Sequence, residues 1–355
     1  MTLHDRIYRE YYILLSQEHP ELSFAEAMTM LGSINGNIII THSEPGLVIF
    51  RAGRSIREPV LRFSFIKEFG LVVRKAGLGM GSAQVYREIL IAINEILGQC
   101  CGKIELRIYN LGRKRAEIDY GLIIKHMREK ISLLHGNTSP NNLSDLSCTI
   151  TIIMGSILVI AIPIARRTGR GRGDRTGYMK DTDILFLANM IVGFGAIGRV
   201  IYDPFGGYGK ILEKICGYDG SLMVIGGDID VKKAIYMKQK LGALDKPCLS
   251  DVIVADALNP PLRPGCIDLV VSDLPYGRRS RSVGEDYLEM PVRFLQSIAR
   301  ILPERSAVLI SISLEQFRRV RDLLQSWGKY RIASVASQYI HGGLTRIYLL
   351  LLTNF

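Results

Sequence analysis

An acidic motif at the end of a predicted strand is the first place in this sequence where the residue types suggest chemistry. The apolar run 267–271 predicts a buried strand, and after Ser272 it is followed by Asp273, Leu274, Pro275 and Tyr276. Ligands of open α/β sheets bind at the carboxyl ends of the strands. A carboxylate and an aromatic ring placed there suit a flat substrate that carries an amine, such as a nucleobase. A plain strand followed by a Pro-Tyr-Gly turn fits the same residues, so the interpretation depends on the rest of the chain.

Three other aspartates close apolar runs of the same kind, namely Asp203, Asp228 and Asp256. Because the carboxyl ends of parallel strands meet at one edge of a sheet, we expect these carboxylates and Asp273 to line that edge together. One such aspartate is unremarkable in an α/β protein, but a series of them is not. The sequence therefore predicts a ligand site at this acidic edge.

The residues around the first of these strand ends indicate the kind of ligand. The glycine-rich turn 206–209 allows a tight bend and a close approach of the backbone to a ligand. Asp228 follows at about the spacing from which an acidic side chain reaches ribose hydroxyls, and Asp256 is placed to face an adenine. Asp203 stands where a dinucleotide would put its pyrophosphate. A cationic adenosine derivative, S-adenosylmethionine, therefore fits better than a dinucleotide.

The segments that must position this edge alternate between strand and helix from residue 181 onward. The last two predicted strands, 331–339 and 345–352, leave no room for a helix between them and predict an antiparallel hairpin. The alternation predicts a doubly wound, mostly parallel α/β sheet with one reversed strand at its end. The other expected elements are helices 181–193, 210–215, 231–241, 288–301 and 315–327, and strands 200–202, 222–225, 252–254, 267–271 and 307–312.

The first half of the chain has a mixed α+β pattern and no catalytic constellation. Ser23 and Glu26 have the spacing of a capping box, which predicts a helix that begins there. The glycine-rich segment 77–81 is interpreted as a turn, because no Lys-Ser/Thr pair follows it as in a phosphate loop. The apolar segment 150–165 is shorter than the roughly 18–20 residues that a spanning helix needs. We interpret it as one or two buried strands.

The composition indicates a polyanionic partner. The net charge is +11 and the isoelectric point is near 9.4, which favours nucleic acid over a membrane surface. Residues 166–180 predict a basic, glycine-rich linker that tethers two halves and contacts phosphates.

None of the 6 cysteines forms a C-x-x-C pair, and the first residues lack an apolar signal segment. We therefore expect no metal site and a cytoplasmic protein with reduced cysteines.

Residues 181–355 resemble class I (Rossmann-like) S-adenosylmethionine-dependent methyltransferases. Asp203-Pro-Phe-Gly-Gly-Tyr-Gly is similar to the first cofactor motif of that family, and Asp273-Leu-Pro-Tyr-Gly to the Asp-Pro-Pro-Tyr motif of enzymes that methylate exocyclic amines. The preceding half resembles a ferredoxin-like piece (1–60) followed by a THUMP RNA-binding domain (61–165). Together with His341-Gly-Gly-Leu-Thr-Arg346, this combination resembles the THUMP-domain tRNA guanosine-N2 methyltransferases of archaea that act at tRNA position 10.

The resemblance implies roles for the matched positions. S-adenosylmethionine would be the cofactor and tRNA the substrate, and no metal would take part. Asp273 and the carbonyl of Leu274 would accept the N–H bonds of the guanine amine, Pro275 would fix the turn, and Tyr276 would stack on the extruded base. The implied cofactor contacts are Asp203, Phe205, Gly206, Gly207, Gly209, Asp228, Ile229, Asp256, Ala257 and Asp273. The implied RNA contacts are Arg166, Arg167, Arg170, Arg278, Arg279, Arg281 and Arg346.

Departures from the family pattern leave alternatives open. Gly206 and Tyr208 replace a usual Cys and Thr in the cofactor turn, and Leu274 replaces the first Pro of the amine motif. The Leu274 variant resembles related THUMP methyltransferases that act in the acceptor stem, at positions 6 or 7. A DNA amine methyltransferase and a non-catalytic RNA-binding protein with a decayed cofactor site are further alternatives. The sequence leaves open whether one or two methyl groups are added, and whether a small activating partner subunit is needed, as in some relatives.

Overall fold

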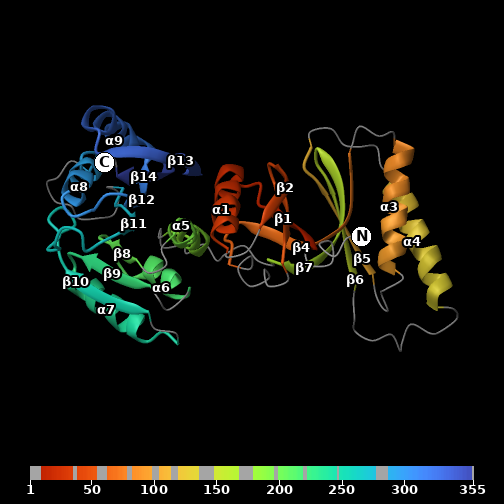
Figure 1. Cartoon of the computed structure of the whole chain (residues 1–355), viewed down its shortest axis with the longest axis horizontal. Helices are drawn as coiled ribbons and strands as arrows, with labels where there is room; N and C mark the ends of the chain where they lie inside the picture. The colour runs from red at the N-terminus through yellow and green to blue at the C-terminus, as the bar shows by residue number, and fades with distance from the viewer. Residues whose placement is uncertain are drawn as a thin grey trace. The chain divides into compact units, whose positions relative to one another are not determined.

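The chain folds into two compact units in the computed structural model (Figure 1). The N-terminal unit comprises residues 1–24, 34–61 and 66–169, and the C-terminal unit comprises residues 25–33, 62–65 and 170–355. The structure describes residues 9–34, 38–53, 62–77, 82–97, 104–112, 119–135, 148–167, 179–195, 199–218, 222–245, 248–276 and 287–353.

The N-terminal unit is built on one seven-stranded sheet. Its elements are β1 (Arg9–Leu15), β2 (Ile39–Glu44), β3 (Leu47–Ala52), β4 (Ile66–Gly77), α3 (Ser82–Leu97), β5 (Ile104–Asn110), α4 (Tyr120–His135), β6 (Cys148–Met154) and β7 (Ile157–Arg166). The strand order is β2-β3-β1-β4-β7-β6-β5, with β5 and β6 parallel and the other neighbours antiparallel. Apolar residues of α3 and α4, among them Ile89, Ile93 and Ile123, pack with the strands in one buried cluster.

This sheet bears on two expectations from the sequence. The segment 150–165 forms the antiparallel pair β6 and β7, as expected for buried strands. The sheet runs without a break from β2 to β5, so the segments predicted as a ferredoxin-like piece and a THUMP domain share it. Their separation into two domains stays a prediction.

The C-terminal unit has a second seven-stranded sheet. Its elements are α5 (Asp181–Gly193), β8 (Val200–Asp203), α6 (Lys210–Cys216), β9 (Met223–Asp228), α7 (Val231–Gly242), β10 (Leu249–Val254), β11 (Leu269–Asp273), α8 (Met290–Ile298), β12 (Ala307–Ser313), α9 (Leu314–Trp327), β13 (Tyr330–His341) and β14 (Leu344–Thr353). The order is β10-β9-β8-β11-β12-β14-β13. The first five strands in this order are parallel, and β14 runs antiparallel to both neighbours, which confirms the predicted terminal hairpin.

Helices cover both faces of this sheet. Phe294 and Ile298 of α8 and Val320 of α9 join a buried cluster with inward-facing strand residues. On the opposite face Met237 of α7 packs so closely on Gly226 of β9 that a Cβ there would lie 2.4 Å from its sulfur. This two-sided cover is typical of a doubly wound sheet, whose ligand edge is the carboxyl end of the parallel strands.

The helix α1 (Pro20–Ser33) begins at Pro20, and the capping box predicted for Ser23 and Glu26 is not formed. Glu26 does not close a capping box with Ser23, whose hydroxyl donates to the carbonyls of Ser16 and Pro20. Instead the Glu26 carboxylate is buried and accepts hydrogen bonds from Ser64 and Asn189, within the C-terminal unit. The spacing of Ser23 and Glu26 therefore predicted a helix cap, whereas the Glu26 carboxylate makes tertiary contacts instead.

The cysteines also differ from the expectation of a fully reduced protein. Cys216 at the end of α6 forms a disulfide with Cys248 just before β10, with Cα atoms 5.2 Å apart. Among the residues that the structure describes, no group of His, Cys, Asp or Glu is arranged to hold a metal ion. Within the same residues, no helix combines the length and apolar character needed to cross a membrane.

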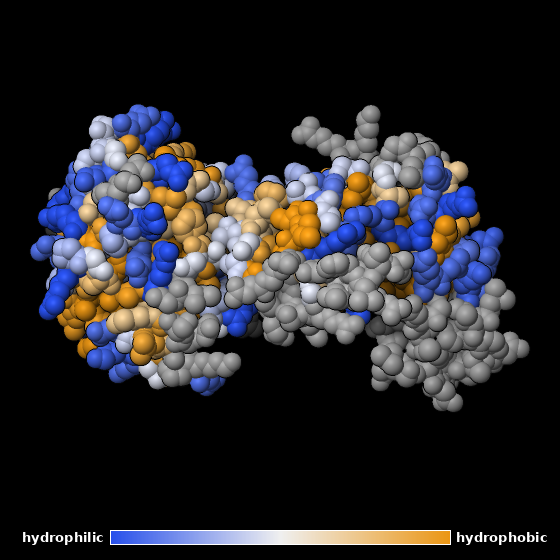
Figure 2. Space-filling view, in the orientation of Figure 1, coloured by the Kyte–Doolittle hydropathy of each residue, from blue (hydrophilic) through white to orange (hydrophobic). Residues whose placement is uncertain are grey.

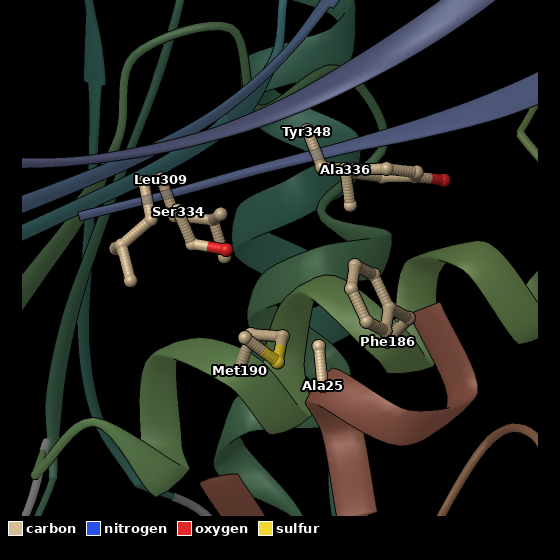
Figure 3. Close-up of a pocket in the computed structure, with 8 residues that line it drawn as sticks. Ala25, Phe186, Met190, Leu309, Ser334, Ala336 and Tyr348 are labelled. Atoms are coloured by element: carbon tan, nitrogen blue, oxygen red, sulfur yellow. The ribbon is translucent and has the colours of Figure 1, made fainter. Parts of the chain in front are cut away.

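A small pocket in the C-terminal unit lies between α1, α5 and the strands β12–β14 (Figure 3). Its walls are apolar except for the hydroxyl-bearing Ser334 and Tyr348, and no carboxylate or basic group lines it. We interpret it as a packing gap and not as a site. Its lining residues are Ala25, Phe186, Met190, Leu309, Ser334, Ala336, Tyr348 and Leu350.

Candidate active site

The aspartates predicted to share one edge do so in the structure. Asp203, Asp228 and Asp273 are the last residues of β8, β9 and β11, and Asp256 lies two residues beyond β10. These four strands are consecutive in the sheet and parallel. The chain reverses its order of progression between β8 and β11, which makes the space beside Asp203 and Asp273 the topological switch point.

The turn after β8 is fixed to the end of β9. Gly207 and Gly209 adopt left-handed backbone conformations, with φ of 53° and 70°, which explains why glycine occupies both positions. The Gly206 amide donates to the carbonyl of Gly227 at 2.8 Å. The Gly207 amide donates to Oδ2 of Asp228 at 3.0 Å. Two hydrogen bonds therefore join the turn to the acidic end of the neighbouring strand.

Asp203 is buried beneath this turn. The Ser272 hydroxyl donates to its Oδ1 at 2.6 Å and accepts from the Phe205 amide at 3.3 Å. Burial raises the pKa of Asp203 to about 7, although the hydrogen bonds from its neighbours oppose the shift. Ser272 thus joins the glycine-rich turn to the strand that carries Asp273.

This buried carboxyl predicts a pH dependence of stability. The pKa of Asp203 is raised by burial from 3.8 to about 7. The folded chain therefore keeps a proton that the unfolded chain releases, and Asp203 lowers the free energy of unfolding as the pH rises from about 4 to about 7. We expect Asp203→Asn to remove this part of the slope, because the amide does not titrate. Urea unfolding of both proteins across this range is the measurement, and equal slopes would contradict the prediction.

The end of β9 exposes an apolar side chain next to a carboxylate. Asp228 is buried and its Oδ1 accepts from the amide of Asp230 at 2.8 Å, while Ile229 is 72% exposed.

The segment after β10 carries the fourth aspartate. Asp256 is exposed and its Oδ1 accepts from the Leu258 amide at 2.9 Å, while Ala257 is buried. Figure 2 shows apolar side chains gathered over the part of the unit that contains β10 and α7. The exposed apolar residues of this part are Ile229, Val231, Ile235, Tyr236, Leu249 and Val254.

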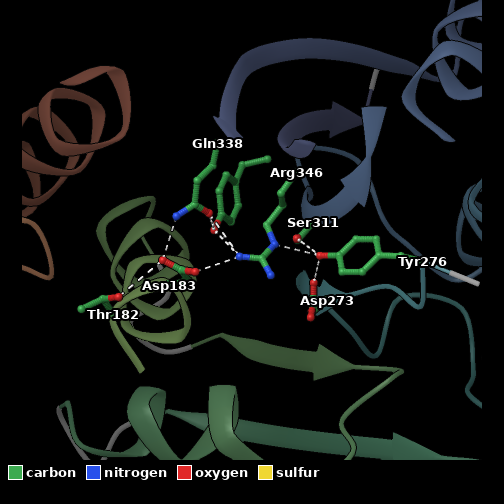
Figure 4. A network of polar contacts seen from close by, with 8 residues as sticks. Thr182, Asp183, Asp273, Tyr276, Ser311, Gln338 and Arg346 are labelled. Atoms are coloured by element: carbon green, nitrogen blue, oxygen red, sulfur yellow. Dashed lines mark hydrogen bonds and ion pairs between the residues drawn. The ribbon is translucent and has the colours of Figure 1, made fainter. Parts of the chain in front are cut away.

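Polar side chains of neighbouring strands contact the amine motif, which comprises residues 273–276 at the end of β11 (Figure 4). The Tyr276 hydroxyl donates to Oδ1 of Asp273 and shares a 2.6 Å hydrogen bond with the Ser311 hydroxyl. It also accepts from Nε of Arg346 at 3.0 Å. Burial raises the pKa of Asp273, whereas the positive charge of Arg346 opposes that shift. The carboxylate and the ring of the motif are thus fixed relative to each other.

The backbone of the motif is anchored as well. Leu274 is buried and its amide donates to the carbonyl of Ser311 at 3.0 Å. The carbonyl of Pro275 accepts from Nε2 of Gln316 at 2.9 Å. Gln316 belongs to the capping box that starts α9, together with Ser313. The helix start therefore holds the loop in place.

The acidic edge has features that fit an adenosine-containing sulfonium cofactor. The turn leaves open space at Gly207, where an added Cβ would meet no atom closer than 3.9 Å. The Tyr202 hydroxyl is the single buried side-chain polar atom without a hydrogen-bond partner among the described residues. It lies next to Gly227, 2.9 Å from the place that a Cβ would take. Acidic groups, an apolar surface at Ile229 and an unsatisfied hydroxyl suit a cationic ligand with ribose hydroxyls.

Comparisons with known proteins agree with this architecture. Neither a protein-family model nor a curated protein sequence matches the chain. The structure of TrmN from Thermus thermophilus matches it with a TM-score of 0.59 and 14% identity, over 97% of this chain and 100% of that one. The chain has the fold of TrmN. This likeness covers almost the whole length of the chain, whose structure is an α/β fold with two mixed sheets.

Two other structures share the fold. A predicted N6-adenine-specific DNA methylase from Listeria monocytogenes matches with a TM-score of 0.58 and 14% identity, over 98% of each chain. SMU.472, solved as a complex with SAH, matches with a TM-score of 0.56 and 12% identity, over 98% of this chain and 99% of that one. At such identities the likeness concerns the fold.

The predicted RNA contacts have different positions. Arg166 ends β7 and Arg167 follows it, both in the N-terminal unit. Arg346 does not lie at the surface: it is 5% exposed and its Nη1 donates to Oδ2 of Asp183 at 2.8 Å. The expectation that Arg346 contacts RNA disagrees with this burial, because its guanidinium is occupied inside the unit. Arg170, Arg278, Arg279 and Arg281 lie outside the described residues.

Several residues of the site escaped the sequence analysis. Asp183 follows the polar residues Asp181 and Thr182 at the start of a predicted helix, so no local pattern marks it, and Arg346 was predicted only as an RNA contact. Ser272 could have been noticed as the polar residue before Asp273. Gln316 has the capping-box spacing from Ser313, which could have marked it. The other missed residues, Ser311, Gln338 and Tyr348, carry no local signal.

Proposed function

We propose that this protein transfers a methyl group from S-adenosylmethionine to the exocyclic N2 amine of a guanosine in tRNA. The observation that carries the proposal is the position of Asp273, hydrogen-bonded to Tyr276, at the switch point of a doubly wound sheet, on the strand next to the one that leads into the glycine turn. The fold shared with TrmN and with the SAH complex of SMU.472 supports methyl transfer as the reaction class. The net charge of +11 supports a nucleic acid substrate.

The proposed cofactor contacts follow from the acidic edge. S-adenosylmethionine, when bound, supplies a methyl group on a positively charged sulfur. The Asp228 carboxylate keeps lone pairs for ribose hydroxyls beyond the backbone bonds that it accepts. Ile229 offers an exposed apolar face to the adenine, and Asp256 lies at the end of the adjacent strand. Phe205, Gly206, Gly209 and Ala257 are proposed to complete the contacts.

The proposed role of the amine motif is to orient a weak nucleophile. The lone pair of the guanine amine is delocalised into the ring, so the nitrogen needs help to attack. Asp273 and the carbonyl of Leu274 would accept its N–H bonds, which aims the lone pair and stabilises positive charge on the nitrogen. The raised pKa of Asp273 suits the later uptake of the proton that the amine loses. The ring of Tyr276, fixed through its hydroxyl, is proposed to stack on the extruded base.

The proposed target is tRNA position 10, with one or two methyl groups added. Positions 6 and 7 of the acceptor stem are the second candidate, and Leu274 is the residue that favours them. A DNA amine is the third, because the Listeria protein with the same fold is described as a DNA methylase.

One experiment separates these substrates. The purified chain is incubated with methyl-labelled S-adenosylmethionine and either unmodified tRNA or double-stranded DNA, and the labelled nucleosides are identified after digestion. We expect N2-methylguanosine or its dimethyl form from tRNA alone. Replacing the target guanosine by inosine, which lacks the N2 amine but keeps the rest of the base, should abolish labelling. Labelled adenine in DNA, or labelling that survives the inosine replacement, would overturn the proposal.

Loss of Asp228 should weaken cofactor binding. Asp228→Ala removes an acceptor that is charged, and hydrogen bonds to charged groups contribute about 1.5–3 kcal/mol, so we expect an increase in Kd for S-adenosylmethionine of about 10–100-fold. Calorimetric titration measures it. Asp251→Ala on β10 is the matched control, since that carboxylate is exposed and accepts from the amide of its neighbour Val252. An unchanged Kd in the Asp228 variant would place the ribose elsewhere.

A further inference from the structure

A buried ion pair between Arg346 and Asp183 connects the Asp273–Tyr276 motif to helix α5 (Figure 4). We propose that Arg346 of β14 and Asp183 of α5 are positioning residues that hold Tyr276 and Asp273 in the geometry needed for amine methylation. The inference rests on the proposed function and deepens it, because it assigns a role to two nearly buried residues that support the motif.

The pair is joined to the motif by direct hydrogen bonds. Nη1 of Arg346 lies 2.8 Å from Oδ2 of Asp183, and the side chains are only 6% and 2% exposed. Nε of the same guanidinium donates to the Tyr276 hydroxyl at 3.0 Å, and that hydroxyl donates in turn to Asp273. A continuous chain of polar contacts thus runs from α5 through β14 to the reacting carboxylate.

Gln338 and Tyr348 hold the ion pair from a second side. Gln338 of β13 donates through Nε2 to Oδ1 of Asp183 at 3.0 Å. Its Oε1 accepts from Nη1 of Arg346 at 3.1 Å and from the Tyr348 hydroxyl at 2.8 Å. Both oxygens of Asp183 are therefore engaged, and the guanidinium plane is set by contacts on two sides. A planar guanidinium held in this way can direct Nε at one point, which a lysine ammonium cannot.

Stability alone is a poor explanation of this pair. Taking two charges out of water costs about as much as their attraction returns, and apolar side chains of the same size often serve a core at least as well. Uncharged side chains occupy the same side of β14 beside the pair: Phe186 of α5 packs against the Tyr348 ring at 4.9 Å, and Leu350 lies next to them. What the charged pair adds is a fixed donor for Tyr276.

The pair also sets the charge around Asp273. The charged and titratable groups that face Asp273 are Arg346 from β14, Asp183 from α5, Tyr276 from its own loop and Asp203 from β8. Among these, Arg346 is the one cation. Removing its charge leaves the carboxylate among like charges, so Asp273 would take up a proton at higher pH and lose its use as an acceptor. The acid limb of the pH profile of kcat should therefore move upward.

The test compares Arg346→Gln, Arg346→Lys, Asp183→Asn and the Arg346→Gln/Asp183→Asn double variant with the wild type. We expect Arg346→Gln to lower kcat by about 10–100-fold, with KM for tRNA and for S-adenosylmethionine within about 3-fold of the wild type, and to shift the acid limb upward. Arg346→Lys keeps the charge, so it should keep the acid limb while kcat falls. The double variant should lose less than the product of the single losses, because both residues act through one contact.

The control is Arg331→Gln, an exposed arginine of β13, which should leave kcat and the pH profile unchanged. Thermal unfolding of every variant separates positioning from loss of the fold, and Arg346→Lys and Asp183→Asn keep the test valid if Arg346→Gln does not fold. An unchanged acid limb in a folded Arg346→Gln variant, an unchanged kcat in a folded Asp183→Asn variant, or fully independent losses in the double variant would overturn the inference. A wild type that methylates a different amine would overturn only the proposed substrate, and the same series would then be measured on that substrate.

Discussion

Replacing Asp273 by alanine is expected to lower kcat for methyl transfer to tRNA by about 10²–10³-fold, the usual effect of removing a group that stabilises charge in the transition state. The carboxylate lies at the end of β11, at the switch point, and shares its contacts with Tyr276. Single-turnover labelling of tRNA with the cofactor in excess measures this step without product release. Asp273→Asn, which keeps an acceptor oxygen but loses the charge, should fall between the alanine variant and the wild type.

Binding measurements show whether the loss lies in catalysis. The Kd of tRNA should change little in Asp273→Ala, because the carboxylate contacts one amine in a large interface. Asp322→Ala on α9 is the matched control, since that aspartate is exposed and its ion pair with Arg321 is a surface one. Full methylation by the Asp273→Ala variant would rule out the mechanism proposed above.

Replacing Glu26 by alanine is expected to destabilise the C-terminal unit by about 3 kcal/mol. The carboxylate accepts from the Ser64 amide at 2.8 Å, the Ser64 hydroxyl at 2.5 Å and the Phe65 amide at 3.0 Å. Nδ2 of Asn189 donates to it at 2.5 Å, and the Tyr218 hydroxyl donates to Oδ1 of Asn189. Alanine would leave these buried donors without an acceptor, and each unpaired group costs about 1–3 kcal/mol.

Urea unfolding followed by circular dichroism measures this loss. Glu21→Ala on the same helix is the control, because Glu21 is exposed and such substitutions usually change the free energy of unfolding by less than about 0.5 kcal/mol. Glu26→Gln should lie between the two, since the amide keeps one acceptor oxygen. Equal stability of the Glu26→Ala variant and the control would mean that water replaces the carboxylate.

Much of the acidic edge could be predicted from the sequence. The positions of Asp203, Asp228 and Asp273 at strand ends follow from the short apolar runs before them, and the alternation of strands and helices places those ends together. The terminal hairpin followed from the absence of room for a crossover helix. These features are encoded locally, by residue type and spacing, and so they can be recognised without knowing what packs against what.

Only the tertiary structure decided which side chains support the motif. Arg346 and Asp183 are 163 positions apart, as are Glu26 and Asn189, and no local pattern joins them. Arg346 was expected to contact RNA, and Glu26 to cap its own helix, because a sequence shows a charge without showing what surrounds it. Their roles depend on how α5 and residues 62–65 pack in the C-terminal unit. Both side chains are buried, and each has hydrogen-bond partners from distant parts of the sequence. Burial depends on how the whole chain packs, so it cannot be recognised from local spacing.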